Sequence, residues 1–200
     1  MKEIDKDKPS VITRSQVADK KYFANICTGI TECEGGYEYD LTSHEFDHQP
    51  TLNDVIDLHS FTADELTELC EYFGEDVVPK ARAIMLSRVE AYDQSDNVNS
   101  FHIGEMTYWL DKATRAGLLL RLQAEQAVGK TTTTLWAETV PVTLPVEVAM
   151  QFLYALENYA SECYDRTAQH IATVEGMQSV QDILAYDYTS GYPERLVLEV

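Results

Sequence analysis

Residues 145–174 have the sequence PVEVAMQFLYALENYASECYDRTAQHIATV, which is the strongest periodic pattern in the chain. Apolar and small side chains recur every three or four residues, which predicts an amphipathic helix of about seven turns. Pro145 suits the first turn, where its missing N–H is not needed, and Glu147 lies near the positive end of the helix dipole. We expect the remaining elements to pack around this helix. Its predicted inner face consists of Ala149, Phe152, Leu153, Leu156, Tyr159, Ala160, Cys163, Thr167, Ile171 and Val174.

Shorter patterns before and after this helix predict a mixture of strands and helices. In residues 21–40, aromatic and polar residues alternate around glycines, which indicates a small hairpin. Thr62 and Glu65 form a capping-box pattern that begins a helix, and Gly74 can end it. Residues 41–60 are ambiguous, although Pro50 favours a loop. Further helices are predicted at 76–93, 112–128 and 179–185, and further strands at 98–109, 131–136, 139–144 and 196–200.

Together these patterns predict an α+β fold. We expect a helical layer, with the long helix at its centre, packed on a small, mostly antiparallel sheet. Residues 1–20 are predicted to be a flexible or partner-bound arm, residues 21–79 a hairpin-plus-helix region, and residues 80–200 a C-terminal α+β domain. Trp109 and Trp136 are the two largest candidates for its core.

The charge of the chain is strongly acidic. Its 200 residues include 15 Lys and Arg against 34 Asp and Glu, and the formal net charge is −19. The acidic residues are spread along the chain without a basic patch, so we expect no direct contact with nucleic acid. An acidic surface can bind a basic partner or cations, or can imitate DNA, but the favoured interpretation is that it maintains solubility.

Neither a membrane span nor a signal peptide is predicted. No apolar run reaches the roughly 18 residues that a membrane helix requires. Residues 1–21 lack an apolar core, so secretion through a signal peptide is not expected. The four cysteines match no zinc pattern, and Cys163 is predicted to be a buried free thiol. Cys27 and Cys33 could pair across the hairpin, although reduced thiols are the favoured interpretation.

One segment matches a metal-binding motif. His44-Glu45-Phe46-Asp47-His48 fits HExxH, which in zinc proteases points both imidazoles at one ion from a single helical turn. The context does not favour a helix, because Pro50 follows closely and apolar periodicity is weak. A chance match in an acidic loop is therefore favoured, with His44, His48 and Glu65 as weak metal candidates. Other sources of a third ligand are Glu68 and His59.

No catalytic constellation stands out from the sequence. The pairs Ser100–His102 and Cys163–His170 are too generic to indicate a nucleophile, and His170 is predicted to be a packed or capping residue. Residues 129–131 resemble the end of a phosphate-binding loop, but they lack its upstream glycine and preceding strand. We predict no enzymatic activity and no cofactor.

Tyrosines are concentrated after the last predicted helix. Tyrosine covers apolar area and carries one hydroxyl, so it suits a core and an interface equally. Packing over the helical layer is the favoured interpretation, and a contact surface is the alternative. The candidate interaction residues are Tyr186, Tyr188, Tyr192 and Pro193.

Four segments in one order resemble a known family. They are residues 108–115, 133–136, 159–170 and 186–194. The chain is similar, over residues 80–197, to a domain-of-unknown-function family of tailed bacteriophages and prophages, often encoded near tail or tail-fibre proteins. The resemblance carries no catalytic set. Arg166 and His170, one turn apart with Asp165 beside them, are suited to bind the 186–193 tail.

The resemblance implies a non-enzymatic structural or virion-associated protein of the tail, tail fibre or head–tail connection. Its expected partners are other phage structural proteins and further copies of itself, in the virion or in the host cytoplasm during assembly. Three alternatives stay open: a tail-fibre assembly chaperone, a zinc hydrolase using the 44–48 segment, and an acidic DNA mimic that inhibits a host protein.

Overall fold

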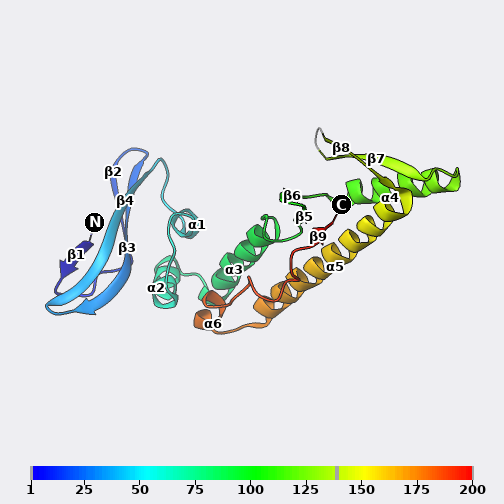
Figure 1. Cartoon of the computed structure of the whole chain (residues 1–200). Helices are drawn as coiled ribbons and strands as arrows, with labels where there is room; N and C mark the ends of the chain where they lie inside the picture. Colours follow the sequence, from blue (N-terminus) through cyan, green and yellow to red (C-terminus); the bar gives the residue numbers. More distant parts are fainter. Residues whose placement is uncertain (1, 138–139, 200) are drawn as a thin grey trace. The chain divides into compact units, whose positions relative to one another are not determined.

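The computed structural model describes residues 2–137 and 140–199 and confirms the predicted α+β class (Figure 1). Small sheets alternate with helices along the chain, and one helix is much longer than the others. The elements are β1 (Lys2–Asp5), β2 (Ile12–Ala18), β3 (Lys21–Cys33), β4 (Gly36–Phe46), α1 (Leu52–Ile56), α2 (Ala63–Phe73), α3 (Val77–Asp93), β5 (Phe101–Ile103), β6 (Met106–Tyr108), α4 (Lys112–Ala127), β7 (Thr132–Ala137), β8 (Val140–Pro145), α5 (Val146–Gly176), α6 (Val180–Leu184) and β9 (Val197–Leu198).

The chain divides into two compact units. Unit 1 contains Met1–Met85 and Val174–Tyr186, and unit 2 contains Leu86–Thr173 and Asp187–Val200. These boundaries differ from the three consecutive regions predicted from the sequence. The reason is that the chain returns to unit 1 after α5, where Arg82 Nε donates to the carbonyl oxygen of Met177 at 2.9 Å.

Unit 1 contains a four-stranded antiparallel sheet in the order β1-β4-β3-β2. The predicted hairpin is confirmed as β3–β4, and it extends to Phe46. At its turn, a Cβ on Gly36 would overlap the carbonyl oxygen of Asp5, so only glycine fits. The prediction of an arm in residues 1–20 is wrong, because β1 and β2 are the two edge strands of this sheet. Their mostly exposed polar side chains hide the strand pattern in the sequence.

Helix α2 of unit 1 begins and ends where the sequence indicates, whereas the short helix α1 lies in a stretch that the sequence left ambiguous. Thr62 and Glu65 form the predicted capping box of α2, and Gly74 ends the helix with φ of 72°. The Glu68 carboxylate accepts a hydrogen bond from the backbone N–H of Val11 at 2.9 Å, which ties α2 to the chain entering β2. The Arg14 guanidinium stacks over the Tyr72 ring 4.9 Å from its centroid, which makes a second tie between β2 and α2.

Unit 2 is organised around α5, whose extent confirms the predicted long helix. The inner face matches the predicted face with one exchange: His170 is buried, whereas Ile171 is 37% exposed. Two small sheets accompany the helix, the antiparallel β7–β8 hairpin and the sheet β6-β5-β9, in which β9 pairs parallel with β5. The single sheet predicted beneath the helical layer is thus replaced by three separate small sheets across the two units.

Two apolar clusters form the core of unit 2, and α5 contributes to both. The first turns of α5 pack with α4 and β8 through Ala149, Leu153 and Leu122. The middle of α5 packs with β5 and β9 through Leu156, Phe101 and Leu198.

The cysteines agree with the predicted free thiols. All four cysteines are free thiols, and Cys163 is completely buried on α5. Within residues 2–137 and 140–199, none of the helices combines the length and apolar character needed to cross a bilayer.

Candidate functional site

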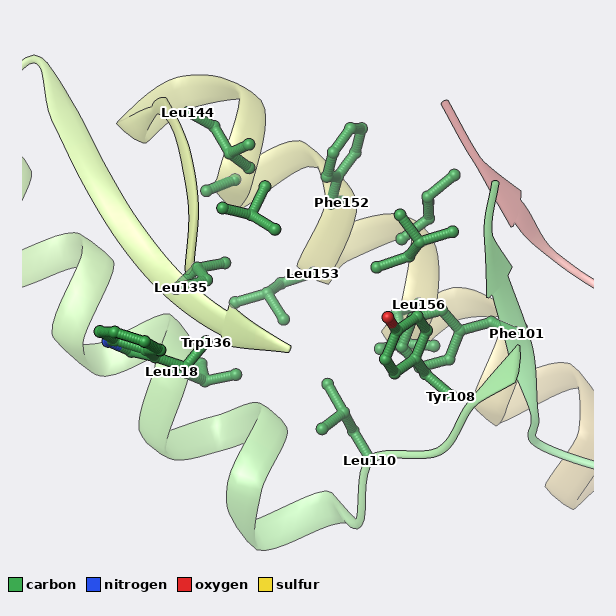
Figure 2. Close-up of a pocket in the computed structure, with 14 residues that line it drawn as sticks. Phe101, Tyr108, Leu110, Leu118, Leu135, Trp136, Leu144, Phe152, Leu153 and Leu156 are labelled. Carbon is green, nitrogen blue, oxygen red and sulfur yellow. The ribbon is translucent and has the colours of Figure 1, made fainter. Parts of the chain in front are cut away.

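An apolar cavity of about 130 Å³ lies in unit 2. Its walls come from α4, α5, the β7–β8 hairpin and the β6-β5-β9 sheet (Figure 2). Along α5, Ala149, Phe152, Leu153 and Leu156 line one side at helical spacing. The cavity therefore lies at the junction of the two apolar clusters.

The lining has almost no hydrogen-bonding capacity. Among the described lining residues, the polar side-chain groups are the hydroxyl of Tyr108 and the indole N–H of Trp136. The Tyr108 hydroxyl already donates to the sulfur of Met106 at 3.3 Å. The lining contains no carboxylate, imidazole or thiol, so this arrangement can hold an apolar group but supplies no acid, base or thiol nucleophile.

The pocket is partly open to solvent, so part of its apolar lining is in contact with water. A concave, mainly apolar pocket with few polar groups is the usual form of a binding site, which makes this pocket the strongest candidate in unit 2.

Both tryptophans lie at the surface, so the prediction that they form the core is wrong. Trp109 is 61% exposed and Trp136 is 66% exposed. In the two-stranded β7–β8 hairpin, successive side chains point to opposite faces, so Trp136 emerges beside the partly buried Leu135. Trp136 also lines the apolar cavity and thus forms its rim. Leu135 and Trp136 are adjacent in one strand and so must point to opposite faces, which is the sequence signal that could have revealed this exposure.

A second, more polar hollow of about 340 Å³ lies elsewhere on unit 2. It is lined by Trp109 and by Tyr164, which is 71% exposed. Its lining also includes an ion pair in which Arg115 Nε donates to the Glu157 carboxylate at 2.7 Å. Arg115 also donates to the carbonyl oxygen of Leu110 at 2.6 Å, so its charge is already used to hold α4 to α5.

The C-terminal tail is held to α5 by the residues that the sequence indicated. Arg166 Nε donates to the carbonyl oxygen of Ser190 at 2.9 Å, and His170 Nε2 lies 3.1 Å from the same oxygen. The hydroxyl of Thr167 lies 3.0 Å from that of Tyr192. These contacts hold the tail against the second half of α5, and we call Arg166, Thr167 and His170 together with the tail residues Ser190 and Tyr192 the tail clasp.

The four candidate interaction residues all lie partly buried along this tail. Tyr188 packs edge-to-face on Tyr92 with centroids 5.8 Å apart, and Tyr192 packs on both Tyr92 and His170. Tyr186 and Pro193 are also half-buried. This placement fits the packing interpretation, and a role in partner contact stays a prediction.

Burial keeps the titratable groups of this clasp neutral. Burial lowers the pKa of His170, and the nearby Arg166 charge lowers it further. Burial raises the pKa of Tyr192, and it raises the pKa of Tyr159 to about 12. Burial also raises the pKa of the Cys163 thiol. These groups are buried and neutral at pH 7, which agrees with the packing role predicted for His170 and Cys163.

The metal motif does not form a helix. His44 lies within strand β4 and His48 follows its end, so the two imidazoles lack the one-turn helical spacing of a zinc protease. His44 Nε2 instead lies 2.9 Å from Nε2 of His59. His48 contacts the carboxylates of Asp47 and Asp54, which raise the pKa of this imidazole.

The remaining metal candidate, Glu65, has a structural role. Its carboxylate accepts hydrogen bonds from the backbone N–H groups of Thr62 at 2.9 Å and Ile30 at 3.2 Å. In the part of the chain that the structure describes, no three His, Cys, Asp or Glu side chains are placed to hold one metal ion.

Comparison of the chain with models of protein families, with curated proteins and with solved structures finds no match.

Proposed function

We propose that the chain is a non-enzymatic structural or virion-associated protein of a tailed bacteriophage, acting through protein–protein contacts of unit 2. The observation that carries the proposal is the exposure of Trp136 at the rim of an apolar cavity. Tryptophan in a partly enclosed pocket is the residue most enriched at binding hot spots. An exposed aromatic beside a preformed apolar cavity is more typical of an interface than of a free surface.

The family-like segments supply these surface aromatics. Trp109 lies in segment 108–115, Trp136 in segment 133–136, and Tyr164 in segment 159–170. All three side chains are well exposed. The same segments supply the tail clasp through Arg166 and His170. The residues on which the phage resemblance rests therefore divide into a scaffold and a set of exposed contact residues.

The proposed partners are other structural proteins of the particle and further copies of this chain. The strongly negative net charge favours partners with basic surfaces and opposes binding to the phosphate backbone of nucleic acid. The lining of the apolar cavity supports binding rather than chemistry. The proposed location is the virion, or the host cytoplasm during assembly.

The test is the amount of this protein in density-gradient-purified particles. We expect the wild-type protein to be present and Trp136→Ala to be depleted by about tenfold or more, as loss of one hot spot predicts. The matched control is Val128→Ala, which removes apolar surface that is 77% exposed and lies outside the four family-like segments. Absence of the wild-type protein from particles, with binding to fibre subunits in the cytoplasm, would instead support an assembly chaperone.

A further inference from the structure

We infer that His44 and His59 form an acid-sensitive latch within unit 1. One proton shared between the two imidazoles holds the connection between α1 and α2 against strand β4, and a second proton releases that connection. This inference does not depend on the proposed function or on the Trp136 surface. It gives His44, the first residue of the metal motif, a role that requires no metal ion. Among the described residues, no third ligand is placed to make this pair a metal site.

The two imidazoles meet through the same ring atom. Nε2 of His44 lies 2.9 Å from Nε2 of His59, and the rings pack edge-to-face with centroids 5.0 Å apart. His44 belongs to β4, whereas His59 lies between the end of α1 at Ile56 and the start of α2 at Ala63. An imidazole nitrogen donates only when it is protonated, so one Nε2 must carry the proton and the other must be bare. The contact therefore joins two elements of unit 1 through a single proton.

A second proton is incompatible with this contact. When both imidazoles are charged, all of their ring nitrogens are donors, so neither Nε2 can accept. Two positive charges at this separation also repel each other, and because both side chains are half-buried, water screens the repulsion less than at a free surface. His44 is fixed in the antiparallel ladder of β3 and β4, where it lies opposite Ala24. We therefore expect the connection that carries His59 to move away.

The elements around the pair carry charged and titratable groups of their own. They are Arg14 on β2 and Tyr22 on β3, which share the sheet face of His44, Glu45 on β4, Asp54 and Asp57 at α1, and Glu65 and Glu68 on α2. Arg14 donates to the carbonyl oxygen of Pro50 at 2.9 Å, and Glu45 pairs with Lys21 at 3.0 Å. Among the carboxylates that the structure describes, none is hydrogen-bonded to either imidazole of the pair, whereas His48 contacts two of them. The closed latch therefore offers no compensating partner to a second charge.

The direction of the pH dependence follows from the environment of His59. Burial lowers the pKa of this imidazole, and the charge of His44 lowers it further. The contribution of the latch to the stability of unit 1 is therefore fully present above about pH 6.5, where an ordinary histidine titrates. It is lost as the pH falls toward the lower pKa that His59 has in the folded protein. Histidine suits such a switch because its charge changes near neutral pH.

The shared proton is tested by NMR of the full chain with isotopically labelled histidine. At about pH 7.5, where ordinary histidines are mostly neutral, we expect one imidazole of the pair to be protonated on Nε2 and the other on Nδ1. Scalar coupling between the two Nε2 nuclei should be detectable across the hydrogen bond and should disappear when the second ring becomes charged. Absence of this coupling at neutral pH in the folded protein, or protonation of both rings on Nε2, would overturn the inference.

Release of the connection is measured through the backbone order parameters of Leu58 and Ser60, which flank His59. We expect values near about 0.85 in the closed latch and below about 0.6 once both imidazoles are charged. The amide of Leu69 in α2 is the internal control and should stay rigid throughout. Unchanged order of Leu58 and Ser60 after the second protonation would contradict the release.

His44→Gln is the variant that distinguishes a latch from a purely structural contact. A glutamine amide can donate to a neutral imidazole and accept from a charged one, so the bond to His59 survives protonation. We expect Leu58 and Ser60 to stay rigid in acid in this variant. We also expect His59 to titrate at a higher pH than in wild type, because the charge of His44 is absent. Should this variant not fold, His59→Gln places the same amide on the other side of the contact.

The matched control is His48→Gln, which removes the neighbouring exposed imidazole in contact with Asp47 and Asp54. Acid release of Leu58 and Ser60 should persist in this variant as in wild type. Release that persists in folded His44→Gln, or that is lost in His48→Gln, would assign the pH dependence to another group and overturn the latch.

Discussion

Nε2 of His170 lies 3.1 Å from the carbonyl oxygen of Ser190, which joins the long helix α5 to the C-terminal tail of unit 2. Because a carbonyl oxygen can only accept, this nitrogen must carry the proton. The same oxygen accepts a hydrogen bond from Arg166, and the Tyr192 ring packs on the imidazole with centroids 5.4 Å apart. One buried side chain thus combines a hydrogen bond and aromatic packing, which makes its removal a sensitive test of the fold.

Replacing His170 with alanine is expected to lower the free energy of unfolding by about 2–4 kcal/mol. The variant loses a fully buried ring and leaves a cavity beneath Tyr192. Urea denaturation measures the change. Asn158→Ala, at an exposed position of the same helix, is the control and should change stability by less than about 0.5 kcal/mol. Equal effects of the two variants would contradict the role assigned to His170.

The lowered pKa of His170 predicts that acid destabilises unit 2. Burial and Arg166 favour the neutral imidazole in the folded state, so the unfolded chain binds more protons below about pH 6.5, where an ordinary histidine titrates. The contribution of neutral His170 to the free energy of unfolding is fully present above this pH. It is lost as the pH falls toward the lower pKa that His170 has in the folded protein. Urea midpoints from about pH 7.5 to 5.5 should fall more steeply for wild type than for His170→Phe, which cannot titrate there. Urea midpoints that change with pH equally in wild type and in His170→Phe would contradict the predicted contribution of His170.

A side chain at Gly191 should destabilise the tail of unit 2. It has φ of +80°, and an added Cβ would lie 2.5 Å from the Arg166 guanidinium, which is held against the tail. We expect Gly191→Ala to cost about 1 kcal/mol for the left-handed backbone, plus the cost of displacing Arg166. Gly104→Ala is a matched control, because Gly104 has φ of +59° and no atom near its added Cβ. A smaller melting-temperature loss for Gly191→Ala than for Gly104→Ala would contradict this account.

Metal removal is expected to leave the protein unchanged. His44 and His59 approach each other as a pair, whereas Glu65 is engaged as a helix cap. We expect dialysis against EDTA to leave the melting temperature unaltered. Glu65→Ala should destabilise unit 1 by about 1–3 kcal/mol in the presence or absence of zinc, because two backbone N–H groups lose their acceptor. A zinc-dependent melting temperature that is lost in Glu65→Ala would indicate a metal site instead.

Local sequence signals predicted the elements well, because caps and periodicity are local properties. Thr62 and Gly74 mark the ends of α2 in the sequence and in the structure. The two edge strands in residues 1–20 escaped prediction, because edge strands with polar, exposed faces lack clear alternation. The return of residues 174–186 to unit 1 is a long-range contact that no local pattern encodes.

The candidate site was harder to predict than the fold. Large aromatics usually pack inside, so the sequence favours a core position for Trp136, whereas the two-stranded hairpin leaves it exposed. The cavity is lined by side chains that are distant in the sequence, such as Leu118, Leu135 and Ala149. Such a grouping of residues becomes visible only when the elements are assembled.

The most direct test of the proposed contact surface is hydroxyl-radical footprinting of Trp136 in purified particles and in the free protein. The proposal predicts that oxidation of Trp136 falls by about fivefold or more in particles, since a hot-spot residue is desolvated by its partner. Tyr72 in unit 1, which is 43% exposed, serves as an internal reference for radical dose. Oxidation of Trp136 at the same rate in particles as in free protein would contradict the claim that this chain works through the Trp136 surface.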